Sequence, residues 1–331
     1  MARVLITGGA GFIGYHLARH LAETTAHEIV LADNLWRGKH DEDLSKLLEN
    51  PRLTFVQGDL TDPTFLPTLP GTFDYVYHLA AVNGTRLFYE VPHEVLRINI
   101  LSLFNLLDWV KVMEEKPRLL FTSSNEAYAG ALESFGQLPL PTPEDVPLVV
   151  SDVYNPRWTY GGSKLIGELM IINYAKSFGI PSVIVRPHNF YGPRAGHDHV
   201  IPQMIARIEA HEEPFTIYGA DETRSFCYIE DAVRAMRHVM EVDDFNIEKA
   251  EIFHIGSDEE TQISDLAETL FDIIGWRPKE IIHAESKKGS VKRRLPDVSK
   301  LKAATGWKHE IQRKEGLKMT IEWYKKHPKK D

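Results

Sequence analysis

A tyrosine and a lysine four residues apart are the first side chains in this sequence that could do chemistry. Tyr160 and Lys164 lie in residues 157–168, a segment that reads as helical, so both side chains share one helix face. A free tyrosine has a pKa of about 10, but a lysine ammonium within a few ångströms stabilises the phenolate. The spacing therefore predicts an acid/base tyrosine, against the alternative of a packed ring beside a solvated charge.

A glycine-rich turn near the N-terminus supplies a candidate cofactor site. Gly8, Gly11 and Gly14 follow an apolar run and open a helical pattern. Glycines at this spacing permit a tight turn and let the backbone approach a pyrophosphate, which the helix N-terminus stabilises. Asp33 follows Gly14 by 19 residues, where its carboxylate can accept from ribose hydroxyls and repel a 2′-phosphate. The pattern favours NAD over NADP, a preference that Arg37 could soften.

Later segments contain further residues that could bind the cofactor or take part in catalysis. Asp59 ends one predicted strand, where its carboxylate could meet the adenine amino group, and Ala80 ends another, where a small residue leaves room for a ligand. Ser124 could hydrogen-bond the oxygen that the candidate tyrosine deprotonates, and Glu126 could act on a neighbouring carbon. Residues 130–156 are rich in Pro and Gly and predict a long irregular loop that covers the site.

These candidates can lie close together only if the strands that carry them end at one edge of a sheet. Apolar runs typical of strands alternate with helical patterns, which indicates a parallel sheet with helices on both faces, a doubly wound α/β fold. The predicted strands are residues 3–7, 28–32, 53–57, 73–79 and 118–122, and the predicted helices include residues 12–23 and 93–115.

Composition narrows the class of protein. The chain has 331 residues and a formal net charge of -9, which argues against a general nucleic-acid binder. Its single cysteine, Cys227, allows no intrachain disulfide, and no apolar run approaches the length of a membrane span. We expect a cytoplasmic protein with no membrane segment and no metal site. Residues 287–331 hold fifteen Lys/Arg against five Asp/Glu, either a solvated helix face or a basic wall toward an anionic ligand.

With these residues in place, the chain resembles an extended short-chain dehydrogenase/reductase, in the NAD-dependent epimerase/dehydratase family that acts on nucleotide sugars. The resemblance adds motifs at residues 186–193, 224–231 and 293–297 and runs through nearly the whole chain. It implies a Rossmann-type NAD-binding domain over residues 1–187, with returning segments near 225–257. A smaller α/β substrate domain would take most of 188–331. It also implies a nucleotide-sugar substrate, and a homodimer formed by apolar helices around 95–112 and 162–178.

The resemblance assigns contacts to individual residues. The cofactor contacts are Gly8, Gly11, Phe12, Ile13, Gly14, Asp33, Asn34, Asp59, Leu60, Leu79, Ala80, Ala81, Asn99, Tyr160, Lys164 and Pro187. The expected substrate contacts are Arg86, Asn125, Asn189, His199, Val200, Arg224 and Arg294. Arg86 departs from the family pattern, and we expect it to pair with a carboxylate such as that of a uronic acid. Arg224 would meet the diphosphate, unless it forms an ion pair with Glu222 or Asp221.

The same resemblance implies a first chemical step. Tyr160 removes a proton from the C4 hydroxyl with help from Ser124, NAD takes the hydride, and Lys164 holds the nicotinamide ribose. The resulting 4-keto sugar can be reduced from its other face, dehydrated across C5 and C6, or decarboxylated at C6. Asn125 stands where 4,6-dehydratases carry an acid, whereas Glu126 is kept as in mannose-type dehydratases and glucuronate decarboxylases.

We expect a nucleotide-sugar epimerase from these residues, with a 4,6-dehydratase or a UDP-glucuronate-type decarboxylase as the alternative. The segment before Tyr160, residues 156–158, also looks like the decarboxylases. A hypothesis of another class is a non-catalytic NAD-sensing scaffold on the same fold. Retention of Ser124, Tyr160 and Lys164 together favours an enzyme.

Overall fold

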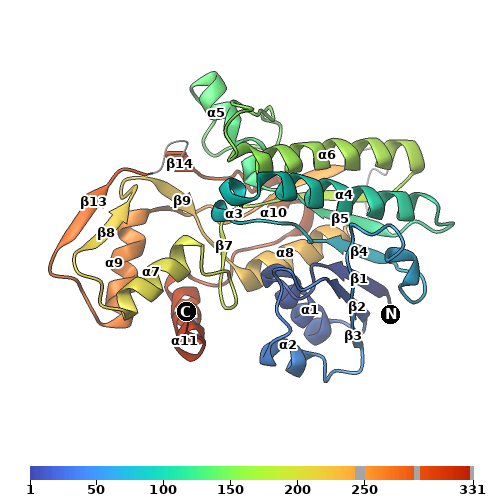
Figure 1. Ribbon diagram of the computed structural model, residues 1–331, viewed down its shortest axis with the longest axis horizontal. Helices are drawn as coiled ribbons and strands as arrows, with labels where there is room; N and C mark the ends of the chain where they lie inside the picture. The colour runs from blue at the N-terminus through green and yellow to red at the C-terminus, as the bar shows by residue number, and fades with distance from the viewer. Residues whose placement is uncertain (243–249, 287–290, 329–331) are drawn as a thin grey trace.

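Seven parallel strands form one sheet at the centre of the larger lobe in the computed structural model (Figure 1). The structure describes residues 1–242, 250–286 and 291–328. Helices cover both faces of the sheet, so its inner strands are buried on both sides and are mostly apolar. In spatial order the strands are β11 (Glu251–Ile255), β6 (Ser182–Pro187), β5 (Arg118–Thr122), β4 (Tyr75–His78), β1 (Arg3–Thr7), β2 (Glu28–Asp33) and β3 (Leu53–Gln57).

Side chains of each strand alternate between two cores, one on each face of the sheet. In β1, Val4 and Ile6 pack into one core and Leu5 into the other. The first core contains residues of α1 (Phe12–Thr24), α2 (Glu42–Leu47) and α8 (Ile229–Glu241), and the second contains residues of α4 (Pro92–Lys111) and α6 (Trp158–Phe178). This arrangement confirms the predicted doubly wound α/β fold.

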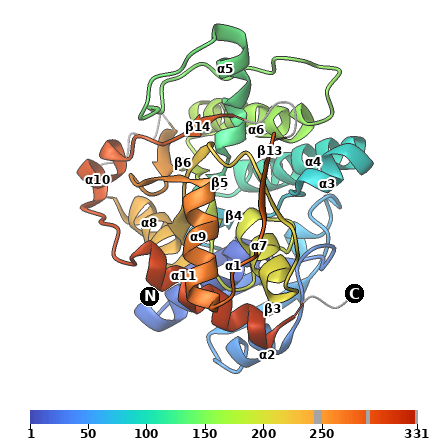
Figure 2. The same cartoon turned by 90° about the vertical axis from the view of Figure 1, so that its left-hand side faces the viewer.

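A smaller lobe lies beyond the carboxyl ends of the main strands (Figures 1 and 2). In it β8 pairs with β13, β9 lies between β12 and β14, and β7 pairs with β10. Its strands are β7 (Phe190–Tyr191), β8 (Phe215–Tyr218), β9 (Thr223–Ser225), β10 (Cys227–Tyr228), β12 (Glu260–Gln262), β13 (Ile281–Ala284) and β14 (Arg293–Arg294). Its helices are α7 (Val200–Glu209), α9 (Ile263–Ile274) and α11 (Arg313–Lys326).

The chain crosses between the two lobes more than once. It returns to the main lobe in α8 and β11, and again in α10 (Ser299–Thr305), which packs against both. The predicted division between residues 1–187, with 225–257, and residues 188–331 did not include this last return. Neither lobe is therefore a continuous stretch of chain.

The segment that follows β5 differs from its prediction. It was expected to be irregular over residues 130–156, but α5 (Ala129–Phe135) opens it and protrudes from the main lobe (Figures 1 and 2). The small residues of its first turn are buried, which lets the helix start close to the sheet, and its end is exposed. The helix predicted over 93–115 ends at Lys111. The remaining short elements are α3 (Thr85–Glu90), η1 (Leu66–Thr68) and η2 (Asn125–Ala127).

Within the described residues, no helix is long and apolar enough to cross a membrane. No group of three or more His, Cys, Asp or Glu side chains in these parts of the chain is arranged to hold a metal ion. A cytoplasmic location stays a prediction. Of the basic segment 287–331, residues 287–290 and 329–331 lie outside the described residues.

Candidate active site

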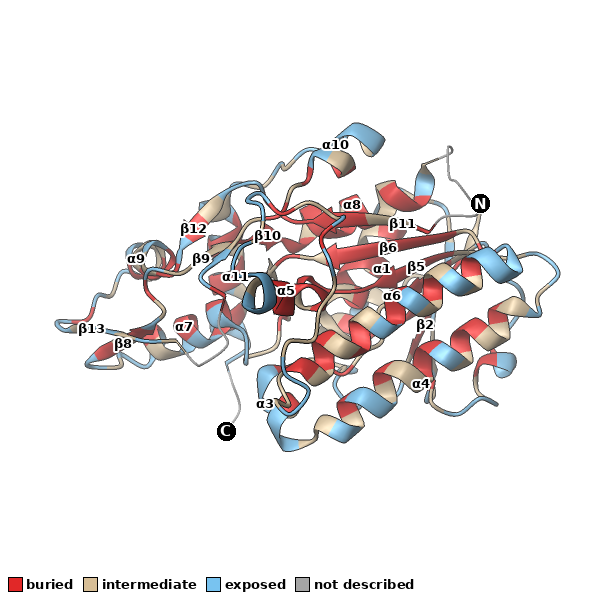
Figure 3. Ribbon diagram, turned by 90° about the horizontal axis from the view of Figure 1, so that it is seen from above, coloured by how far each residue is buried: buried red, intermediate tan, exposed pale blue. Residues whose placement is uncertain are grey.

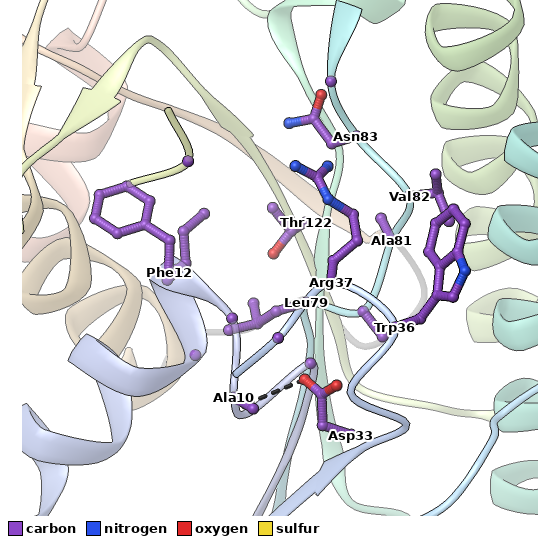
Figure 4. A pocket seen from close by; sticks show the side chains of 18 of the residues that line it. Ala10, Phe12, Asp33, Trp36, Arg37, Leu79, Ala81, Val82, Asn83 and Thr122 are labelled. Carbon is purple, nitrogen blue, oxygen red and sulfur yellow. Dashed lines mark hydrogen bonds between the residues drawn. The ribbon is translucent and has the colours of Figure 1, made fainter. Parts of the chain in front are cut away.

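A cavity of about 560 Å³ lies between the carboxyl ends of the main strands and the smaller lobe (Figure 4). The glycine-rich turn, the ends of β2 to β6, the start of α6 and residues 194–199 contribute to its wall. Most of the residues predicted for cofactor, substrate and catalysis line it together. They are Gly8, Gly11, Phe12, Ile13, Gly14, Asp33, Asn34, Asp59, Leu60, Leu79, Ala80, Ala81, Ser124, Asn125, Glu126, Tyr160, Lys164, Pro187, Asn189, His199 and Arg294.

Backbone conformation and close packing require glycine at two positions of the glycine-rich turn. Gly8 has a φ of +73°, and a Cβ atom on Gly14 would lie 2.2 Å from the carbonyl oxygen of Gly8. Gly11 is the N-cap of α1 and has no side-chain cap, so the first amides of this helix remain available. A phosphate group fits such a cradle because amides and the helix dipole both favour an anion.

Asp33 is fixed at the end of β2, on the wall of the same cavity. Its carboxylate accepts hydrogen bonds from the amide of Ala10 at 3.1 Å, drawn in Figure 4, and from the amide of Leu35 at 2.8 Å. Burial raises the pKa of Asp33, while these two amides oppose that change. Nearby, Asn34 donates to the Asp59 carboxylate at 3.3 Å. The two carboxylates suit the hydroxyls and amino group of an adenosine.

Tyr160 and Lys164 both lie near the start of α6, on the face toward the sheet. The ring of Tyr160 stacks on Phe88 with centroids 5.1 Å apart, which fixes its direction. The Lys164 ammonium donates to the carbonyl of Thr122 at 2.7 Å and lies 5.7 Å from the centroid of the Tyr160 ring. Both residues are buried, because the helix packs its glycines and this pair against strand β5 and η2.

The expected effect of the lysine on the tyrosine is not seen. Burial raises the pKa of Tyr160, and the charge of Glu126 adds to that rise. A hydrogen bond with Ser124 and the charge of Arg37 oppose it. Lys164 does not offset the burial, because its own pKa falls to about 7 and its ammonium is directed at a backbone carbonyl. Proximity along the helix was visible in the sequence, whereas burial was not.

Glu126 is paired with two arginines at the cavity wall. Its carboxylate lies 2.6 Å from the Arg294 guanidinium and 3.6 Å from that of Arg157. Burial alone would raise the pKa of Glu126, but the charges of these two arginines outweigh it, and the pKa is lowered. Glu126 is therefore an anion at neutral pH and is poorly suited to donate a proton.

Three predicted substrate contacts, Arg86, Val200 and Arg224, lie outside the cavity. Arg86 does not line the pocket as expected: its side chain is 63% exposed and pairs with Glu90, one turn along α3, at 2.8 Å. Val200 is the first residue of α7 and is exposed, although its neighbour His199 lines the cavity. The sequence showed that Arg86 carries a charge near the pocket but did not show which face of its helix it takes.

Asn99 and Arg224 also hold other positions than those expected. Asn99 is buried and supports the segment after β4, because its side chain exchanges hydrogen bonds with the backbone of Val82 and donates to Ser163. It does not line the cavity. Arg224 pairs with Glu222 at 2.6 Å, which was the alternative to its predicted contact with a diphosphate.

Contacts that the sequence analysis missed hold the smaller lobe against the start of α2. Arg194 pairs with Asp41 at 2.7 Å, and its guanidinium lies 4.1 Å from the centroid of the Tyr15 ring. Trp323 of α11 donates to Asp43 at 3.1 Å. Both Arg194 and Trp323 line the cavity. Their partners are 153 and 280 residues away in the chain, so no local pattern could have indicated them.

Known proteins resemble this chain over nearly its whole length. The model of the family described as "GDP-mannose 4,6 dehydratase" matches residues 5–320. UDP-glucuronic acid decarboxylase 5 of Arabidopsis thaliana is 32% identical over 324 residues, which are 97% of this chain and 88% of the relative. UDP-N-acetyl-alpha-D-glucosaminuronate decarboxylase of Bacillus cytotoxicus is 31% identical over 337 residues, covering 98% of each.

A solved structure also matches at the level of the fold. UDP-glucuronic acid 4-epimerase from Bacillus cereus, in complex with UDP-glucuronic acid and NAD, is 27% identical with a TM-score of 0.84. The match covers 98% of this chain and 99% of that chain.

Proposed function

Because the chain belongs to the GDP-mannose 4,6-dehydratase family, we propose that it oxidises C4 of a UDP-linked hexuronic acid and releases C6 as carbon dioxide. Its relatives are epimerases, dehydratases and decarboxylases of nucleotide sugars, and the protein is an NAD-dependent enzyme of this kind. The observation that carries the choice of reaction is the charge pair of Glu126 with Arg294 in the cavity wall.

The first step would use the residues at the start of α6. The phenol oxygen of Tyr160 takes the proton of the C4 hydroxyl, and Ser124, which hydrogen-bonds Tyr160, also holds that hydroxyl. Bound NAD⁺ supplies the acceptor for the C4 hydride, and its positive charge favours the phenolate. The glycine-rich turn and Asp33 would hold this cofactor, because the first amides of α1 have no side-chain cap and Asp33 lines the same cavity.

The second step follows from the position of the ketone. A C4 ketone makes the C6 carboxylate a β-keto acid, so the C5–C6 bond can break and its electron pair can pass to the C4 oxygen. Tyr160, now protonated, and Ser124 would stabilise that oxygen. Arg294 offers the substrate carboxylate a guanidinium, and the adjacent charge of Glu126 disfavours the bound anion relative to neutral carbon dioxide. C5 would then take a proton from water, and Tyr160 would return its proton to the C4 oxygen as C4 recovers its hydride.

The same charges argue against the other two reactions. A 4,6-dehydration needs an acid that protonates the C6 hydroxyl, but Asn125 cannot supply one and Glu126 is held as an anion. Epimerisation at C4, which the sequence alone favoured, uses Tyr160 and Ser124 but needs no paired charge beside C5 and C6. It remains the second candidate, on the same uronic acid, because the UDP-glucuronic acid 4-epimerase shares the fold.

Product analysis separates these candidates. The purified protein is incubated with NAD⁺ and, in separate reactions, UDP-glucuronic acid, UDP-N-acetylglucosaminuronic acid, UDP-glucose and GDP-mannose. We expect stoichiometric carbon dioxide and a UDP-pentose from a uronic acid substrate. An isomeric uronic acid without carbon dioxide would indicate the epimerase, and a 4-keto-6-deoxy sugar from a neutral substrate would indicate the dehydratase. No product from any substrate would favour the scaffold.

A charge-removing variant tests the role of the pair. Glu126→Gln keeps the volume of the side chain and should lower the rate of carbon dioxide release by about 100-fold or more, with NAD binding unchanged. Glu133→Gln, on the exposed side of α5 where Glu133 accepts from Ser151, is the matched control and should leave the rate unchanged. Equal rates for the two variants would remove the support for decarboxylation.

We also propose that the enzyme forms a homodimer through the outer faces of α4 and α6. These two long helices lie side by side on one face of the molecule (Figure 3). Their outer surface carries several exposed apolar side chains, which water solvates poorly. They are Leu96, Phe104, Ile166, Leu169 and Phe178. Light scattering after chromatography should give twice the mass of the chain, and Leu169→Asp should halve it.

A further inference from the structure

Arg37 extends into the cofactor cavity from the loop after β2. Figure 4 shows its side chain directed away from Asp33, toward Asn83 and Thr122. Two glycines from opposite lobes make room for its guanidinium. A Cβ atom on Gly84 would lie 3.4 Å from one of its terminal nitrogens, and a Cβ atom on Gly196 would lie 3.8 Å from the other.

The buried cations that line the cavity already have partners. Arg294 pairs with Glu126, Arg194 pairs with Asp41, and Lys164 donates to a backbone carbonyl. In the described parts of the chain, no hydrogen bond or ion pair engages the side chain of Arg37. It stays accessible to solvent inside the cavity, and Asp198 and Tyr160 act on it only as nearby charges.

Arg37 lies between the places expected for the two ends of the dinucleotide. Asp33 marks the end that receives the adenosine ribose, and Tyr160 marks the end where the nicotinamide must meet the sugar. A dinucleotide that reaches from one to the other passes its diphosphate along the glycine-rich turn between them. The guanidinium of Arg37 lies near Tyr160 and away from Asp33, so it is not directed at the ribose 2′ position.

We propose that Arg37 binds the diphosphate of the dinucleotide from the side opposite the glycine-rich turn. The amides at the start of α1 hold one side of the diphosphate, and the guanidinium fork bonds oxygens that these amides leave free. From the sequence alone, Arg37 was connected only with the choice between NAD and NADP. The proposed role depends on the cofactor and not on which sugar reaction the enzyme performs.

Equilibrium binding to the nucleotide-free protein tests this role without any turnover. Trp36 and Trp323 line the cavity, so their fluorescence reports occupancy. Arg37→Gln should weaken NAD⁺, ADP-ribose and ADP by about 10- to 100-fold, the value of hydrogen bonds to a charged group. Adenosine, measured by displacement, should change by less than about twofold because it has no phosphate.

Two matched variants make the test specific. Arg86→Gln removes the same charge from the nearby surface, where Arg86 pairs with Glu90, and should change none of the affinities by more than about twofold. Lys39→Gln removes the other exposed cation of the loop. An equal loss for adenosine and ADP, or the same loss in Arg86→Gln or Lys39→Gln, would overturn the proposal. A loss confined to NADP⁺ would assign Arg37 to the 2′ position and would also overturn it.

Discussion

Replacing Glu168 by glutamine should destabilise the fold by about 3–5 kcal/mol, because a buried guanidinium then loses its counter-charge. The Glu168 carboxylate accepts from Arg186 at 2.8 Å and 2.7 Å, one bond to each oxygen, and from Ser123 at 2.5 Å. The side chains of Glu168 and Arg186 are each 2% exposed. Glutamine has the same shape, but its amide nitrogen would face a donor of Arg186, so one charged bond is lost and a donor is left without a partner.

Urea unfolding followed by near- and far-UV circular dichroism measures this loss, and coincident transitions would validate a single unfolding free energy. Glu94→Gln is the matched control. Glu94 also pairs with an arginine on a helix, Arg97 at 3.0 Å, but the two side chains are 34% and 53% exposed. Its loss should cost less than about 1 kcal/mol. Equal costs for the two variants would refute the argument from burial.

Replacing both members of the Glu168–Arg186 pair distinguishes the cost of an isolated buried charge from the cost of losing the pair itself. Glu168→Met with Arg186→Met removes both charges and leaves no isolated ion, so it should cost less than Glu168→Gln alone. A larger cost in the double variant would mean that Ser123 and the backbone depend on the charges themselves.

Lys164→Met should flatten the pH dependence of stability above neutrality. Burial lowers the pKa of Lys164 to about 7. Between about pH 7 and 10 the unfolded chain keeps a proton that the folded protein has released, so stability rises with pH by up to about 1.4 kcal/mol per unit. Urea unfolding across that range measures the slope, and equal slopes in both proteins would contradict it. Gly14→Ala should abolish NAD binding because its Cβ would lie 2.2 Å from the carbonyl oxygen of Gly8, whereas Gly162→Ala, with 3.5 Å to its nearest neighbour, should bind normally in the same fluorescence titration. Arg194→Gln should speed the release of bound NAD by about tenfold, since it removes a charged hydrogen bond between the lobes; an unchanged release rate in rapid filtration would count against this role.

The sequence predicted those parts of the fold that depend on local pattern. Strands β1 and β5 have the predicted bounds, because strands buried on both faces are mostly apolar. The glycine-rich turn was equally readable, since Gly8 and Gly14 are required by a positive φ and a close backbone contact. Helix α5 was not predicted because it is short and begins with small residues, so its sequence has no clear apolar period.

Charged side chains were harder to assign, because a sequence shows a charge but not its partner. Arg86 and Arg224 were expected to bind substrate, yet each pairs with a glutamate close to it in the chain. The role of Arg37 could not be read either, since the glycines that make room for it come from distant segments. The pKa of Tyr160 moved against expectation because burial, a property of the whole fold, raises it, and Lys164 is directed at a backbone carbonyl.

The contacts of Trp323 and Arg194 with Asp43 and Asp41, at the start of α2, have a consequence for biosynthesis. Trp323 follows Asp43 by 280 residues, so the start of α2 is synthesised long before the helix that packs on it. A growing chain therefore leaves this part of the main lobe without its contact to α11 until residue 323 has been made.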